Sequence, residues 1–123
     1  MKSMNIFFVV FVVIAFLSCN HSKSHSEGVP PKAPPTGGEE LFNHHCAGCH
    51  GIGAKGTDRG PTFLTKIYEP NHHADVAFRM APQNGVRAHH WNFGDMPKIG
   101  VTPKEVNEII PYIRWLQREA GIH

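Results

Sequence analysis

The chain has 123 residues, with 12 basic and 10 acidic side chains and a formal net charge of +2. This length is enough for one domain. So small a positive excess argues against a nucleic-acid partner, because phosphate binding needs a concentrated basic face.

The first residues have the pattern of an export signal. Lys2 gives a positive start, and residues 6–17 form an uninterrupted apolar run, which is too short to span a bilayer as an ordinary helix. We therefore predict a signal peptide of the lipoprotein type over residues 1–18. The sequence LSCN at its end resembles a bacterial lipobox, although Phe16 occupies the position where leucine is usual. That resemblance implies that Cys19 becomes the lipidated first residue of the mature protein. The alternative is a plain signal peptide followed by an incidental cysteine.

Residues 19–37 are predicted to form a flexible linker. Serine, proline and glycine dominate this stretch, and Val29 is its only large apolar residue, so it cannot bury a core. We interpret it as a tether that holds a folded domain, residues 38–123, away from a membrane surface. Burial of apolar side chains alone gives a domain of this size only marginal stability, so such domains often rely on a metal or cofactor.

The first part of the domain is predicted to hold two helices and a loop. Thr36 begins a T-x-x-E pattern, which predicts a first helix from about residue 38 into the cysteine motif. Residues 51–60 are rich in glycine and are expected to form a loop. Asn71 is the expected cap of a short helix that reaches Met80. No segment shows sustained period-two alternation, so we expect almost no sheet.

The last part of the domain is predicted to be one helix. Thr102 begins a second T-x-x-E pattern with Pro103 at the first helical position, which is a strong start signal. Gly121 occupies the position of a C-terminal cap. We expect Pro111 to kink this helix. One apolar face is expected from residues at three- and four-residue spacings, namely Val106, Ile109, Ile110, Ile113 and Leu116.

Residues 46–50, CAGCH, match the C-x-x-C-H attachment signature of c-type haem. Two thiols three positions apart on a helical turn can add to the two vinyl groups of one haem, and the next residue then offers an imidazole to the iron. The sequence therefore predicts one covalently bound haem c, with Cys46 and Cys49 as thioether ligands and His50 as an iron ligand.

Two other interpretations of this motif are weaker. A structural zinc site needs four ligands, and the chain has no second C-x-x-C. A redox dithiol is expected in a βαβ setting, whereas the flanks here are predicted to be helical. A small zinc-binding module without haem remains the alternative from another class.

Residues 39–120 resemble a class I cytochrome c beyond the haem motif. The resemblance rests on Phe42 before the motif, the pairs Gly60-Pro61 and Met96-Pro97, and the aromatic residues Tyr112 and Trp115. It implies an all-α fold, with about three to five helices wrapped around the haem and the N- and C-terminal helices crossing. It also implies that Phe42 meets the Tyr112 and Trp115 region at that crossing.

The resemblance further implies the ligand set. The carbonyl of Pro61 would accept the free N–H of His50, and Met96 would be the second iron ligand. Met80 competes for that role, but it lies in an apolar helical pattern and is expected to fill the core. Four histidines also compete, and we expect them to be surface or loop residues whose adjacent side chains point apart: His72, His73, His89 and His90.

The remaining candidate residues concern the periphery of the haem. Arg79, Arg87 and Trp91 each offer a donor that suits a haem propionate. Gly60 is expected to allow close approach of the chain to the haem plane. His44 and His45 are expected to be bystanders on the first helix.

The predicted function is electron transfer without enzymatic activity. A haem with both axial positions filled has no open site, and it exchanges single electrons with donor and acceptor redox proteins in the membrane or the periplasm. The lipid at Cys19 would anchor the domain on the periplasmic side of a membrane. Two alternatives remain. One is a haem enzyme or gas sensor with a labile sixth ligand, and the other is the cytochrome subunit of a larger oxidoreductase complex.

Overall fold

The computed structural model describes residues 34–123, so the predicted signal peptide and Cys19 lie outside the described residues. The expected all-α fold is confirmed for the described part: it contains helices and an isolated bridge between Val86 and Met96, and no strand. None of its helices is long and apolar enough to cross a membrane. The elements are α1 (Thr36–His45), α2 (Ala47–His50), η1 (Ile52–Ala54), η2 (Lys66–Tyr68), α3 (Asp75–Asn84) and α4 (Pro103–Glu119).

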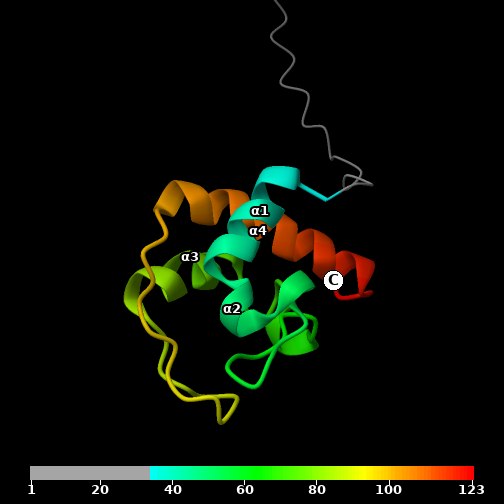
Figure 1. The fold of residues 1–123 in the computed structure, drawn as a ribbon. Coiled ribbons are helices and arrows are strands. Elements are labelled where there is room, and N and C mark those ends of the chain that lie inside the picture. The colour runs from blue at the N-terminus through cyan, green and yellow to red at the C-terminus, as the bar shows by residue number, and fades with distance from the viewer. Residues whose placement is uncertain (1–33) are drawn as a thin grey trace, which may run out of the picture.

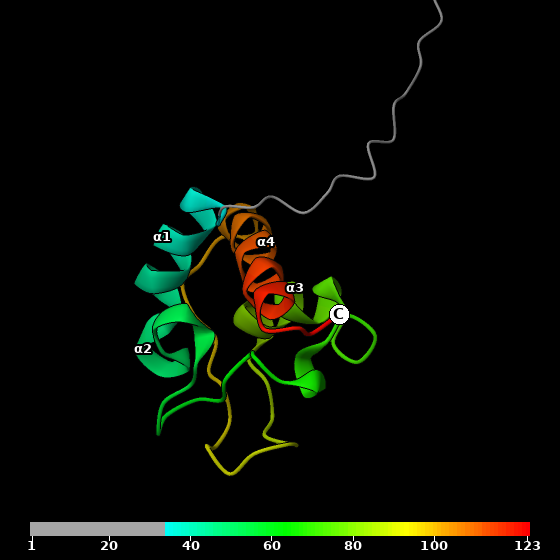
Figure 2. The same ribbon diagram turned by 90° about the vertical axis from the view of Figure 1, so that its right-hand side faces the viewer.

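Helices α1 and α4 cross near the N-terminus of the domain (Figures 1 and 2). Phe42 of α1 is fully buried and lies 5.6 Å, between ring centroids, from Tyr112 of α4, as expected. Gly38 permits this approach, because a Cβ atom placed there would overlap the backbone carbonyl oxygen of Glu108. The crossing holds α1 in place, and α1 leads directly into the cysteine motif.

The start of α1 differs from the prediction. The helix begins at Thr36, and its N-cap is Pro35, which makes no side-chain cap. Thr36 is therefore already inside the helix and does not cap it, so the expected capping box is absent. The backbone N–H of Glu39 is instead satisfied by the carbonyl of Pro35 at 3.0 Å.

Both ends of α4 agree with the sequence. The hydroxyl of Thr102 accepts the N–H of Glu105 at 3.3 Å, and the Glu105 carboxylate accepts the N–H of Thr102 at 2.8 Å, which completes a capping box. At the other end Gly121 has a φ of 74°. Its N–H and that of Ile122 bond back to the last turn, which is a Schellman motif. Helical conformation continues through Pro111.

Helix α3 begins later than the sequence suggested. Its N-cap is Ala74, not Asn71, because a turn comes first: the carbonyl of Glu69 accepts the N–H groups of both His72 and His73. Met80, the expected core filler on this helix, is 54% exposed. The side of α3 that faces the core carries Phe78, which packs against the buried cluster.

Arg114 joins α4 to the segment before α3, a role that the sequence did not indicate. This side chain is only 8% exposed. Its guanidinium donates to the carboxylate of Asp75 at 2.9 Å and to the carbonyls of Tyr68 at 2.8 Å and His73 at 2.5 Å. A buried guanidinium is tolerated only when such acceptors surround it. Arg114 therefore fixes the turn that carries His73.

Candidate haem site

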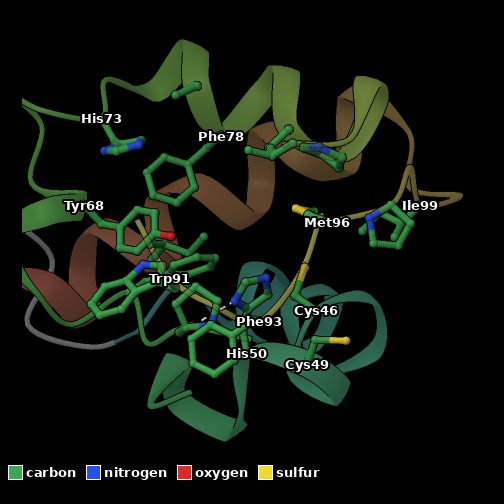
Figure 3. Close-up of a pocket in the computed structure, with 18 of the residues that line it drawn as sticks. Cys46, Cys49, His50, Tyr68, His73, Phe78, Trp91, Phe93, Met96 and Ile99 are labelled. Carbon is green, nitrogen blue, oxygen red and sulfur yellow. Dashed lines mark hydrogen bonds between the residues drawn. The ribbon is translucent and has the colours of Figure 1, made fainter. Parts of the chain in front are cut away.

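A cavity of about 330 Å³ lies between the α2 turn, α3, α4 and the long loop that joins α3 to α4 (Figure 3). In Figures 1 and 2 this loop, coloured yellow, projects away from the helices. The cavity wall is mainly apolar, which suits a flat organic ring and excludes water from it. The apolar side chains of the wall include Phe63, Phe78, Ile99, Ile109 and Ile113.

The two cysteines and the histidine of the motif all line this cavity. The N–H of Cys46 bonds to Phe42 at the end of α1, and the N–H of His50 bonds to the carbonyl of Cys46 at 2.9 Å. One helical turn thus carries all three residues, with the Cys46 side chain directed toward Met96 (Figure 3). Both thiols are free. Burial, with a smaller effect of Cys49, raises the pKa of the Cys46 thiol to about 11, so this thiol stays protonated near neutral pH.

The imidazole of His50 is oriented by the loop that follows. Its Nδ1 lies 2.9 Å from the carbonyl oxygen of Pro61, so Nδ1 carries the proton and donates it. The hydrogen bond expected from the Gly-Pro pair is therefore present. Burial lowers the pKa of His50, and the bond to Pro61 opposes that shift. The ring of Phe63 packs against the imidazole with centroids 4.3 Å apart. A neutral imidazole held this way keeps Nε2 free to bind a metal.

Gly60 acts differently from the expectation. It does not line the cavity, and a Cβ atom placed there would lie 2.9 Å from the carbonyl oxygen of Cys49. The glycine therefore permits close approach of the loop to the α2 turn. Two further contacts secure the same loop: Thr57 Oγ1 donates to the Cys49 carbonyl, and Arg59 donates to that of Gly48.

Met96 reaches the cavity from the side opposite the α2 turn (Figure 3). Its backbone exchanges two hydrogen bonds with Val86, at 2.8 and 2.9 Å. Gly85 precedes this bridge with a φ of 75°, and a Cβ atom there would lie 2.8 Å from the carbonyl oxygen of Met96. The exposed Met80 does not line the cavity. The position of Met96 is therefore compatible with its predicted role, whereas that of Met80 is not.

The structure places only two of the three candidate propionate contacts at the cavity. Arg87 and Trp91 line the cavity, and Arg79 does not. The exposed Arg79 donates instead to the side chain of Asn107 at 2.8 Å, so its predicted contact is not supported. The indole N–H of Trp91 is buried in the cavity wall and makes no hydrogen bond of normal geometry. It lies near enough to the Tyr68 hydroxyl to oppose the rise that burial causes in the pKa of Tyr68.

The residues of the cavity fit a covalently bound haem. A buried donor without a partner costs free energy, so the Trp91 N–H favours a bound group that carries an acceptor such as a carboxylate. Two thiols on one turn suit attachment to two vinyl groups, and the imidazole of His50 and the thioether of Met96 are both side chains that bind haem iron.

His45, expected to be a bystander, also lines the cavity, and its Nε2 lies 3.7 Å from a carboxylate oxygen of Glu105.

Comparison with known proteins supplies the family. No curated protein and no solved structure matches the chain. Residues 36–117, about two thirds of the chain, match the sequence model of a family described as cytochrome c. Covalently bound haem c and haem-based electron transfer between redox proteins define that family, whose members are typically electron carriers. The chain therefore belongs to the cytochrome c family.

Proposed function

We propose that the protein is a single-electron carrier whose haem iron is bound by His50 and Met96. The bound haem supplies an iron that takes up and returns one electron. Cys46 and Cys49 would hold the ring through thioether bonds. The observation that carries this proposal is the placement of the Met96 thioether across the cavity from an imidazole whose Nδ1–H is engaged by Pro61. With His50 and Met96 both bound to the iron, no open position would remain for a substrate.

The side chains around the cavity support this role in two ways. Methionine sulfur stabilises ferrous iron, so a His/Met pair raises the reduction potential relative to two histidines. The apolar wall excludes water, which limits solvent rearrangement when the charge of the iron changes. The bond from His50 to Pro61 holds the imidazole in one orientation.

The carrier function predicts a one-electron, closed haem. A redox titration of the holoprotein should follow a single n = 1 Nernst curve. Optical and resonance Raman spectra should show six-coordinate low-spin iron, and added carbon monoxide should leave the ferrous spectrum unchanged. A five-coordinate ferric haem that binds carbon monoxide or turns over peroxide would instead support the enzyme or sensor alternative. A negative pyridine haemochrome assay together with bound zinc would support the zinc module.

We also propose that the domain works at a membrane surface, exported by residues 1–18 and anchored by lipid on Cys19. The support is the sequence alone: the lipobox-like LSCN and the proline- and serine-rich stretch that follows it. Such a tether raises the effective concentration of the domain near membrane-bound redox partners. The partners would be donor and acceptor proteins of a membrane-associated redox chain, or the other subunits of one complex.

Replacing Cys19 by serine should release the holoprotein from membranes. The variant lacks the thiol that accepts lipid, while its haem domain is unchanged. Immunoblots of membrane and soluble fractions measure the distribution, and the haem spectrum reports the domain. Ser22→Ala changes the same segment without removing the thiol and should stay with the membranes. Retention of the Cys19→Ser protein in the membrane fraction would contradict lipidation at this residue.

A further inference from the structure

Four histidines that the sequence places in two distant pairs meet in space. His72 and His73 lie in the turn before α3, and His89 and His90 lie in the loop after it. Helix α3 carries the chain away from the first pair and the loop returns it, so the rings of His72 and His73 lie 5.5 and 5.4 Å from that of His90. The expectation that adjacent histidines point apart is wrong here, because the rings of His72 and His73 stack at 12° and 5.0 Å.

Ring nitrogens from three of these residues converge. One ligand atom each from His72, His73 and His90 lies within 4.8 Å of the other two. Zinc binds imidazole nitrogen at about 2.0–2.1 Å, so the three atoms must draw slightly closer to share one ion. His72 and His90 are exposed and can do this by ring rotation.

The least exposed member of the cluster is already held as a metal ligand requires. His73 Nδ1 lies 2.5 Å from the carbonyl oxygen of Ile67, so Nδ1 carries the proton and Nε2 keeps its lone pair. Metal-binding histidines commonly donate their second N–H to a carbonyl in this way. The backbone around His73 is fixed as well, because its carbonyl accepts from the buried guanidinium of Arg114.

We propose that His72, His73 and His90 form a binding site for a divalent late transition-metal ion of the zinc and copper class. The site is separate from the haem iron. Three nitrogen donors without a carboxylate select this class over magnesium and calcium, which prefer oxygen. His73 and His90 are also part of the haem cavity wall, whereas His72 is not. The metal site therefore lies beside the haem site, and a cation bound there favours the reduced haem by adding positive charge nearby.

Calorimetric titration of the oxidised holoprotein with Zn²⁺ tests the proposal. We expect one ion per chain in the wild type. Mutation of a residue that only supports a metal ligand commonly weakens metal affinity by about 10–100-fold. Removal of a ligand itself in His72→Ala should therefore weaken Zn²⁺ binding by at least that factor. The matched control is His44→Ala, which removes an exposed histidine from the adjacent pair on α1 and should leave the affinity unchanged.

Two further measurements show whether weaker Zn²⁺ binding by His72→Ala comes from loss of the metal site or from damage to the haem domain. The haem spectrum of His72→Ala should equal that of the wild type, because this side chain lies outside the cavity wall. Saturating Zn²⁺ should raise the reduction potential of the wild type and leave that of His72→Ala unchanged. The proposal is overturned if the wild type binds no Zn²⁺, if His72→Ala binds it as tightly as the wild type, or if His44→Ala loses binding equally.

Discussion

Replacing Met96 by alanine should leave the haem attached and lower its reduction potential by on the order of 0.1 V, a fraction of the roughly 0.8 V that axial ligands span. Attachment depends on Cys46 and Cys49, which lie on the other side of the cavity (Figure 3). Loss of the thioether removes the ligand that stabilises ferrous iron, so the oxidised state becomes relatively more stable. Potentiometry with optical detection measures the shift, and the ferric spectrum should change as the sixth ligand is lost.

The loop should survive this change, which makes the readout specific. Met96 is held by two backbone hydrogen bonds to Val86, and alanine keeps both. Met80→Ala is the matched control, because Met80 is exposed and lies outside the cavity; its spectrum and potential should equal those of the wild type. An unchanged spectrum in Met96→Ala would identify another sixth ligand, and His73, His89 and His90 of the cavity wall would then be tested in turn.

The parts of the site that the sequence predicted are those encoded by local chemistry. The C-x-x-C-H spacing requires a helical turn, and the structure forms one at α2. The capping pattern at Thr102 and the glycine at 121 also act within a few residues of themselves, and both formed as expected. Pro61 was placed correctly through the family resemblance, since no local pattern links it to His50.

The features that the sequence did not predict depend on distant neighbours. The T-x-x-E pattern at Thr36 matches that at Thr102, yet the first helix begins at Thr36 itself with Pro35 as its N-cap, so no side-chain cap forms. Gly60 lies against the backbone of Cys49 and not in the cavity wall, because the loop folds back onto that residue. No local pattern indicates the role of Arg114, because its acceptors lie far back along the chain. The histidine cluster likewise depends on how α3 and its flanking segments pack.

Replacing Gly38 by alanine should destabilise the holoprotein by about 1–3 kcal/mol, the usual cost of overpacking. Gly38 is buried where α1 crosses α4. The new methyl group would overlap the backbone carbonyl of Glu108 and lie 3.0 Å from the Cβ of Tyr112. A backbone carbonyl within a helix cannot rotate away, so the two helices must separate. Unfolding in guanidinium chloride, followed by circular dichroism, measures the free energy of unfolding.

The neighbouring glycine provides the control. Gly37 is exposed on the same helix, and a Cβ atom there would meet only a side-chain oxygen of Glu108 at 3.5 Å, which is an ordinary contact. Gly37→Ala should therefore stabilise the protein by about 0.5–1 kcal/mol through its effect on the helix. The two variants add the same methyl group at consecutive positions, and their expected changes in the free energy of unfolding have opposite signs. Equal stabilities would show that the α1–α4 contact adjusts at little cost. A lower free energy of unfolding in Gly38→Ala alone would show that the close approach of α1 and α4, the crossing from which α1 leads into the cysteine motif, stabilises the domain.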